Sequence, residues 1–444
     1  MTYENIKSTI LTFLVLGSFF LTWNLWTYQP NYELMENTNY VQEVSIGEKK
    51  DIKKVVKPDQ VIFHYQNSHY GTMSTIEIDK MIREISEWNI YDLKNYTNKV
   101  EDFNRTLHGE GNVEILFPEK VPVSIYKNVL DFENKSLPRF SFDRIVINMD
   151  NIQKETGTIY FVSYDEKKVF ISHVSSTDLT NFNQTFFKTS YRFPKYFLYQ
   201  PTKDLDLFLP ENVTVMMKYK YYPDYLDSDK FKEALFTDPS FVQKSFIPEG
   251  EEFGEEYTNG SSKMNIYKNK NLLFYVNPIE ESELVGNSSE ILQKGIEFIN
   301  EHAGWTDPYR FVGMDAINQK VTFRLYSSDG YPVFNENGMS EIIEVWGKNE
   351  INKYLRPNFT LDLPLRSEMS EIPTPSGREI IEFLKNQKGI KPEYLSDLRL
   401  GYHMEKDPKE PKLIVLEPSW FYRYNGTWAQ IRLDVVKGER NGLE

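Results

Sequence analysis

Side chains that could perform catalysis or bind a metal are few in this chain. It has six histidines among 444 residues and no cysteine, so a cysteine nucleophile is excluded. His64 and His69 fall on a predicted strand and the loop after it, where they would face each other only by accident. A zinc site needs several converging ligands. We therefore predict no metal site and interpret the histidines as surface or packing residues, including those with no partner at ligand spacing: His108, His173, His302 and His403.

Carboxylates are abundant, but their spacing does not place two of them across a cleft, as hydrolases require. The densest group lies on residues 248–260, which we predict to be an exposed loop. We interpret this group as a solvated acidic surface, and weak binding of a divalent cation is the alternative. The group comprises Glu249, Glu251, Glu252, Glu255 and Glu256.

Sequence motifs for catalysis are also missing. The chain contains no P-loop, no G-x-S-x-G and no H-E-x-x-H, and Gly109-Glu110-Gly111 lacks the third glycine of a dinucleotide-binding loop. We predict no catalytic residue, no cofactor and no enzymatic activity. A net charge of −14 also argues against binding to nucleic acid through the overall field.

The strongest pattern is an apolar segment near the N-terminus. No charged side chain occurs between residues 8 and 32, and residues 9–26 are almost wholly apolar. At about 1.5 Å per residue, a helix of this length spans a hydrocarbon core of roughly 30 Å. Trp23, Trp26 and Tyr28 follow as interfacial anchors, and Pro30 ends the helix. We predict a cytoplasmic tail at residues 1–7, a transmembrane helix at 8–28 and a stalk at 29–57.

A cleaved signal peptide is the alternative interpretation of this segment. Cleavage needs small residues at the end of the apolar run, and here that end is bulky and aromatic. Lys7 precedes the span, whereas Glu33 and Glu36 follow it. This weak basic bias favours a cytoplasmic N-terminus and an extracytoplasmic body in the cell membrane.

One face of the predicted helix suits contact with another helix. Ser18 and Thr22 form a small-x-x-x-small pair, which lets a second helix approach closely, and their hydroxyls can bond across helices. An ordinary anchor that tolerates small residues is the alternative. The candidate contact residues are Leu11, Val15, Ser18, Thr22 and Leu25.

The rest of the chain is predicted to fold as an α+β body. Aromatic residues make up 15% of the sequence, which favours sheets. The lack of cysteine in an exported body indicates a Gram-positive bacterium. We predict three α+β domains at residues 58–195, 196–357 and 358–444. Their clearest strands are expected at 61–65, 113–117, 121–126, 144–148, 158–164, 168–173, 213–221 and 272–276, and helices at 176–188, at 230–236 and after a capping box, Ser74-x-x-Glu77.

The last two domains contain a repeat. The tetrad Ile296-Glu297-Phe298-Ile299 recurs as Ile381-Glu382-Phe383-Leu384, and Gly304 matches Gly389 at the same offset. Each tetrad is predicted to lie on a helix that starts at a capping box, at Asn287 or Ser376, and ends at its glycine. Alternating strands are expected after each helix, at 310–314, 321–326 and 331–334, and at 398–404, 413–417 and 421–424. We therefore predict two similar helix-plus-antiparallel-sheet units.

Residues around the apolar segment resemble a known family. Glu4-Asn5-Ile6-Lys7 precedes the segment, and Leu21-Thr22-Trp23 followed by Trp26-Thr27-Tyr28-Gln29-Pro30-Asn31-Tyr32-Glu33 ends it. This pattern is similar to the YycH (WalH) family of membrane-anchored accessory proteins of the WalK/WalR (YycG/YycF) two-component system. Pro375-Ser376-Gly377-Arg378-Glu379 also resembles the related protein YycI.

The resemblance implies a function as well as a fold. It implies one anchor and three α+β domains, the last two alike. It also implies a non-enzymatic regulator that acts with YycI on the WalK (YycG) sensor histidine kinase, through transmembrane and extracytoplasmic contacts, to tune cell-wall metabolism. The alternative is an extracytoplasmic binding module for a cell-wall fragment or peptide that makes no direct contact with the kinase.

Overall fold

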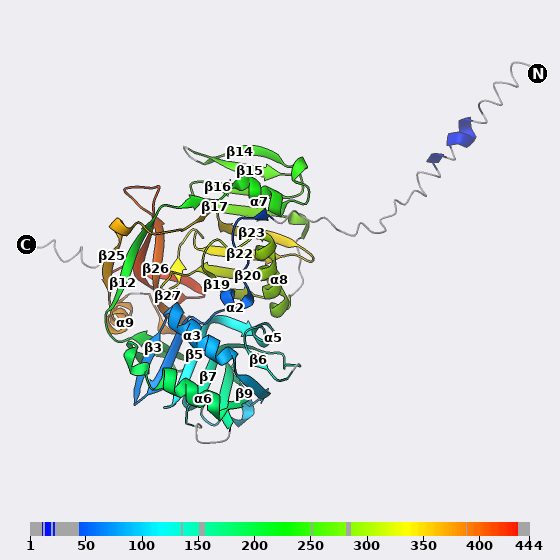
Figure 1. Cartoon of the computed structure of the whole chain (residues 1–444). Coiled ribbons are helices and arrows are strands. Elements are labelled where there is room, and N and C mark those ends of the chain that lie inside the picture. The colour runs from blue at the N-terminus through cyan, green and yellow to red at the C-terminus, as the bar shows by residue number, and fades with distance from the viewer. Residues whose placement is uncertain are drawn as a thin grey trace, which may run out of the picture. The chain divides into compact units, whose positions relative to one another are not determined.

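The computed structural model describes residues 11, 14–18, 21–22, 44–134, 136–150, 156–249, 252–280, 286–387 and 389–433 (Figure 1). The chain divides into two compact units, Met1–Gln42 and Glu43–Glu444. In the first unit the described residues are helical and exposed. Within the described part of the chain, no helix has both the length and the apolar character needed to cross a membrane.

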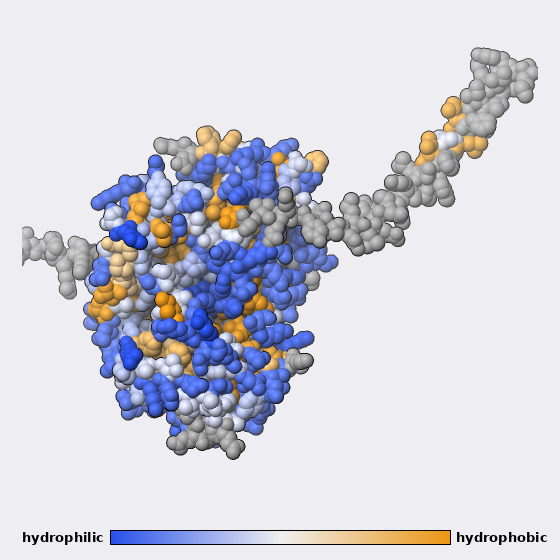
Figure 2. Space-filling view, in the orientation of Figure 1, coloured by the Kyte–Doolittle hydropathy of each residue, from blue (hydrophilic) through white to orange (hydrophobic). Residues whose placement is uncertain are grey.

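The second unit is mixed α and β and consists mostly of sheets. Its visible face is largely hydrophilic, as expected from the net charge of −14 (Figure 2). The largest sheet has ten strands, paired antiparallel except for the last pair. Their order is β11 (Leu205–Pro210), β10 (Lys195–Thr202), β3 (Ser68–Thr72), β2 (Gln60–Tyr65), β5 (Asn112–Pro122), β7 (Ser141–Asn148), β8 (Thr156–Ser163), β9 (Lys168–Ser175), β4 (Asn89–Asn95) and β6 (Asp131–Phe132).

The two faces of the ten-stranded sheet carry different layers. Helices α3 (Thr75–Ser86) and α6 (Ser176–Phe182) lie across one face (Figure 1), where Trp88 meets Phe182 with ring centroids 5.6 Å apart. The short helix α4 (Phe103–His108) packs on β5 and brings Leu107 to a separate small core with Val146 and other residues. Because side chains alternate along a strand, residues between the core positions of β2 and β5 point toward this second face.

A second sheet of eight antiparallel strands follows in the chain. Its order is β14 (Gln243–Glu249), β15 (Glu252–Thr258), β16 (Lys263–Tyr267), β17 (Leu272–Val276), β23 (Ile351–Pro357), β22 (Glu341–Trp346), β20 (Lys320–Leu325) and β19 (Tyr309–Asp315). Helix α8 (Ser288–Glu301) packs on β19 and β20. The short helices α2 (Ile52–Val55) and α5 (Val123–Tyr126) lie where this sheet meets the ten-stranded one, and α7 (Ser228–Leu235) packs near β18 (His302–Ala303).

The third sheet has six strands and is built from distant parts of the chain. Its order is β21 (Val333–Phe334), β26 (Leu395–Lys406), β27 (Ile414–Tyr424), β12 (Thr214–Tyr221) and β25 (Ser370–Thr374), with β28 (Thr427–Ile431) also on β27. Helix α9 (Gly377–Asn386) precedes its long hairpin. Two smaller pairs complete the fold: β1 (Val44–Ser45) with β18, and β13 (Asp224–Tyr225) with β24 (Phe359–Thr360).

The sheets cut across the predicted domain ranges. Strands β10 and β11 complete the ten-stranded sheet, although residues 196–210 were assigned to the central domain. Strands β12 and β21, from the same range, join the third sheet instead. Since strand pairing alone does not define domains, the three ranges stay a prediction. The structure shows one compact unit of mixed α and β structure across Glu43–Glu444.

Several predicted elements are confirmed and others are wrong. Strands β2, β7, β8 and β9 and helices α3, α6 and α7 form where expected. Ser74 is the N-cap of α3 but makes no side-chain cap bond, so the capping box there is wrong. Residues 123–126 form α5, not the end of a strand, because Pro122 lacks an N–H donor and sits at the N-cap of that helix. The predicted loop at 248–260 contains strand β15, and residues 331–334 contribute β21 to the third sheet.

Helices α8 and α9 confirm the predicted pair of repeat helices. Ser376 and Glu379 form the expected capping box, whereas Asn287 caps α8 through the N–H of Ser289 at 3.2 Å. Gly304 and Gly389, each two residues beyond a C-cap, have positive φ of 76° and 107°. The predicted core residues are all buried: Ile296, Ile299, Ile381 and Leu384. That the two units share one topology stays our prediction.

Glu344, buried in β22 beneath α8, predicts an unusual dependence of stability on pH. A Cβ on Gly295 of the helix would lie 2.5 Å from Glu344 Oε2, so the carboxyl is tightly enclosed. Burial raises the pKa of Glu344 well above its usual 4.5, against a weaker opposing effect from the Trp346 indole. The folded state therefore holds a proton that the unfolded chain releases. The stability that depends on this proton is fully present below about pH 4.5 and is lost as the pH rises.

We expect Glu344→Gln, which cannot ionise, to be more stable than the parent chain at about pH 8 and equal to it near about pH 4. The parent should lose up to about 1.4 kcal/mol per pH unit more than the variant in this window. Urea unfolding across the pH range measures the difference. Glu297→Gln, on the exposed face of α8, is the control. If the free energy of unfolding changes with pH in the same way for the parent and for Glu344→Gln, the prediction is contradicted.

Candidate functional site

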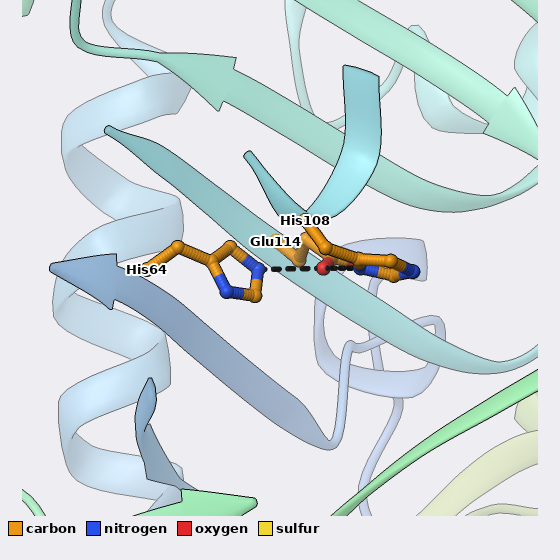
Figure 3. Close-up of side chains that lie close together, drawn as sticks. All are labelled: His64, His108 and Glu114. Atoms are coloured by element: carbon orange, nitrogen blue, oxygen red, sulfur yellow. Dashed lines mark hydrogen bonds and ion pairs between the residues drawn. The ribbon is translucent and has the colours of Figure 1, made fainter. Parts of the chain in front are cut away.

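Five ionisable side chains converge on the second face of the ten-stranded sheet. They come from four strands and one helix end, and His64 and His108 approach Glu114 from opposite sides (Figure 3). Strand alternation turns Glu114 away from its neighbours Val113 and Ile115, which are in the main core. The cluster consists of His64 on β2, His69 on β3, His108 at the end of α4, Glu114 on β5 and Asp206 on β11.

Glu114 is the centre of this cluster. Its Oε1 lies 2.7 Å from His64 Nε2 and is also bonded to His108 Nδ1, while its Oε2 accepts from Arg144 at 2.9 Å. The far nitrogen of each histidine is also engaged. His64 Nδ1 lies 2.7 Å from His69 Nδ1, and His108 Nε2 lies 2.9 Å from Asp206 Oδ2.

A further layer of side chains holds these groups in place. Gln200 Nε2 donates to Asp206 Oδ1 at 2.6 Å, and the Asp206 N–H donates to the Tyr164 hydroxyl at 2.9 Å. The Arg144 guanidinium stacks 3.8 Å from the centre of the Tyr164 ring. Phe208 packs its ring against all three histidines, with centroid distances of 5.1 to 5.3 Å. The cluster is therefore positioned and largely shielded from water.

The charges of the cluster shift its pKa values in opposite directions. Burial lowers the pKa of His108, but Glu114 and Asp206 outweigh it and raise the pKa to about 9. Burial would raise the pKa of Glu114, yet His108, His64 and Arg144 hold it well below its usual value. For His69, burial and the neighbouring His64 lower the pKa to about 4. At neutral pH the two carboxylates of the cluster therefore face the positive charges of His108 and of the neighbouring Arg144.

A small cavity lies beside the cluster. It has a volume of about 180 Å³ and separates the ten-stranded sheet from β26 of the third sheet. Arg144, Tyr164 and Asp206 line one side, and Asp397 and Arg399 line the other. Chemically, the cluster can hold a proton or a cation between nitrogen and oxygen atoms.

The sequence missed this cluster. The expectation that His64 and His69 would not face each other is wrong, because they are direct partners in the register of β2 and β3. Gln66 and Asn67 form the two-residue turn between them, with φ of 53° and 54°, as in a type I′ hairpin. That turn is the one signal that could have paired them. His108 also has ligand-spaced partners, which only the fold brings together.

The acidic group that the sequence placed in a loop belongs to the β14–β15 hairpin. Glu255 pairs with Lys244 at 3.0 Å and with Lys268 at 3.5 Å, and Glu256 pairs with Lys263 at 2.8 Å. Glu251 lies outside the described residues. Glu255 and Glu256 are therefore neutralised by lysines instead of converging on a cation, and Glu249 accepts from the N–H of Asn269 at 3.2 Å.

Part of the predicted membrane-contact face can be located. Leu11, Val15, Ser18 and Thr22 are helical and exposed in the N-terminal unit. Leu25, Trp23, Trp26 and Tyr28 lie outside the described residues, so the contact face and the interfacial anchors stay predictions.

Comparison with known proteins decides the family. A model of the YycH protein, C-terminal domain, matches residues 204–438, and a model of the YycH protein, N-terminal domain, matches residues 4–190. The chain belongs to the YycH family. The resemblance found around the N-terminal segment is therefore confirmed.

Individual members of the YycH family agree with this assignment. A protein of Bacillus subtilis (strain 168) described as "Two-component system WalR/WalK regulatory protein YycH" is 24% identical over 467 residues, with 100% of both chains covered. The crystal structure of YycH from Bacillus subtilis matches with a TM-score of 0.74 and 21% identity, covering 88% of this chain and 100% of that one, so the fold is shared. A relative described as a regulatory protein is consistent with a non-enzymatic role, which stays a prediction for this chain.

Proposed function

We propose that this YycH-family chain is a membrane-anchored, non-enzymatic regulator of the WalK sensor histidine kinase. It acts with YycI, through transmembrane and extracytoplasmic contacts, to tune signalling in cell-wall metabolism. The observation that carries the proposal is the match along the whole chain to a relative described as a WalR/WalK regulatory protein. The described residues of the N-terminal helix are largely hydrophobic (Figure 2), which supports a role for this helix in the membrane.

The physical basis of such regulation is a small bias in a two-state equilibrium. A kinase whose two states differ by a few kcal/mol changes its output when a partner helix packs better against one state. Ser18 and Thr22 give this chain a helix face that permits close approach. The proposed arrangement needs the N-terminus in the cytoplasm and the body outside.

The proposed location has a direct test. Protease added to intact protoplasts should digest the body, and the mature chain should keep Met1 or Thr2 at its N-terminus. The bulky residues at the end of the apolar segment, which leave no signal-peptidase site, are the reason. An N-terminus beyond Tyr28 would contradict the anchor, and a protected body would contradict the orientation.

Ser18→Leu and Thr22→Leu should change the expression of genes under WalR control without changing the level of the protein. Leucine favours the bilayer, so the helix still inserts, but its bulk blocks close approach of a second helix. Reporter expression and immunoblotting of membranes measure the two effects. Leu16→Phe is the matched control, because residue 16 lies about 200° around the helix from residue 18 and also gains bulk.

A polyleucine helix in place of residues 8–28 separates the two candidate functions. Normal expression of genes under WalR control with this generic anchor would place any regulatory contact wholly outside the membrane and would favour the extracytoplasmic binding module. Altered expression of these genes, with the body still exported, supports the proposed contact between helices.

A further inference from the structure

We propose that His64, His108 and Glu114 bind a divalent transition-metal cation, and that zinc is the ion their atoms fit best. Nothing in this proposal depends on the proposed kinase contact. Each residue offers one ligand atom, His64 Nε2, His108 Nδ1 and Glu114 Oε1, and all three atoms lie within 4.8 Å of one another. Two imidazole nitrogens and one carboxylate oxygen are a ligand set that zinc uses when its fourth position is open.

The outer contacts of the three ligands are those that a metal site needs. A histidine ligand usually donates its second nitrogen to a carboxylate or carbonyl, which fixes the orientation of the ring. His108 meets the Asp206 carboxylate in this way at 2.9 Å, whereas the second nitrogen of His64 is held by the His69 ring at 2.7 Å. The second oxygen of Glu114 is held by Arg144. Every ligand therefore points one atom inward and is fixed through its other atom.

An ion can enter when the three ligand atoms, which lie within 4.8 Å of one another, shift by roughly 1 Å. Ligands of a tetrahedral zinc, at about 2.0–2.2 Å from the metal, lie roughly 3.4 Å apart. The spacing of His64 Nε2 and Glu114 Oε1 is 2.7 Å, so this pair must open by less than about 1 Å. The cation would take the place of the protons that each nitrogen shares with Oε1.

Charge also favours a cation at this position. Glu114 and Asp206 contribute two negative charges, and Arg144 supplies one positive charge. Apart from the histidines, the charges around the site therefore sum to −1, which attracts a cation. Phe208 against the three rings excludes bulk water, which strengthens the attraction between the cation and its ligands.

Zinc binding is tested on the full-length chain in detergent. After treatment with EDTA and removal of the chelator, ZnCl2 is added, the chain is separated by gel filtration, and bound zinc is measured by elemental mass spectrometry. We expect one zinc per chain in the parent protein, and loss of that zinc in His64→Gln and His108→Gln. His69→Gln, which removes only an outer contact, should bind zinc about 10- to 100-fold more weakly.

His403→Gln is the matched control, because His403 lies on β26 and its side-chain ion-pair partner is Glu405, at 3.9 Å. It should bind zinc like the parent protein. Bound zinc that stays at the parent level in both His64→Gln and His108→Gln would overturn the proposal, as would a parent chain that binds none.

Cobalt provides a readout that does not depend on any substitution. Co²⁺ added to the metal-free parent chain should give the strong visible absorption of a four- or five-coordinate ion, and ZnCl2 should abolish it by competition. If the spectrum remains that of the hydrated Co²⁺ ion, the proposal is wrong, even where the histidine variants fail to fold.

Discussion

Replacing Asp59 with alanine should lower the free energy of unfolding by about 3–5 kcal/mol, the usual cost of removing one partner from a buried ion pair. Asp59 precedes β2 and is fully buried. Its Oδ2 accepts from the Tyr326 hydroxyl at 3.1 Å and forms an ion pair with Arg399 of β26. One carboxylate therefore joins the chain segment that enters the ten-stranded sheet to β26 of the third sheet and to Tyr326, which directly follows β20 of the eight-stranded sheet.

Neighbouring contacts reinforce this junction and raise the expected cost. Arg310 of β19 donates to the Thr75 hydroxyl at 2.6 Å and stacks 4.3 Å from the Tyr326 ring. Without Asp59, the Tyr326 hydroxyl and one side of the Arg399 guanidinium would stay buried without a partner. An unsatisfied buried donor carries its full desolvation penalty.

Urea unfolding at neutral pH measures the effect as a lower midpoint with an unchanged slope. Asp397→Ala is the matched control, because Asp397 also pairs with Arg399, at 2.6 Å, but is 19% exposed. Asp397→Ala should lower the free energy of unfolding by clearly less than Asp59→Ala does. Equal losses for the two variants would show that the junction gains nothing from the buried position of Asp59.

Local pattern was enough to predict several strands that are rich in β-branched and aromatic residues. Strands β2, β8 and β9 are buried along most of their length, and their sequences show it. The capping box of α9 could also be predicted from the sequence, because the motif spans only four residues. Strands such as β3 and β10 were missed, since they contain little alternation and are fixed by their partners in the sheet.

Strand β27 shows why a local rule can fail. Two strands are predicted at 413–417 and 421–424, on either side of Pro418, yet β27 is continuous. Pro418 pairs with Tyr402, whose N–H points away from β27 to Pro332. In such an antiparallel pair the Pro418 nitrogen also points away from β26. It faces the gap between β12, which pairs with residues 414–416, and β28, which pairs with 420–424, so no partner needs its missing N–H.

The histidine cluster lay beyond sequence reasoning for a different reason. Only His64 and His69 are linked by a local turn. Glu114 reaches them through the pairing of β2 with β5, and Asp206 through β11 at the far edge of the sheet. Contacts of this kind depend on the order of strands, which no spacing along the chain encodes.

The first described residues of the second unit give the second large prediction. This segment, residues 44–50, is bound to the end of α8 and to the residues after it. Ile46 and Gly47 donate to the Ala303 carbonyl at 3.0 and 2.6 Å, and Glu48 and Trp305 exchange two further backbone bonds. These first described residues of the unit are therefore bound next to the eight-stranded sheet, although the ten-stranded sheet comes first in sequence.

Gly47→Val should release this segment, because a Cβ at Gly47 would lie 2.4 Å from the Trp305 carbonyl oxygen. Loss of these backbone bonds, at about 1 kcal/mol each, should speed hydrogen exchange of the amides at positions 46, 48 and 305 by roughly 100- to 1,000-fold. Glu48→Ala, which shortens an exposed side chain but keeps the backbone bonds, should exchange like the parent protein. Slow exchange in Gly47→Val would mean that the segment accommodates a side chain, whereas fast exchange with an intact core would show that these backbone bonds can open without unfolding of the core.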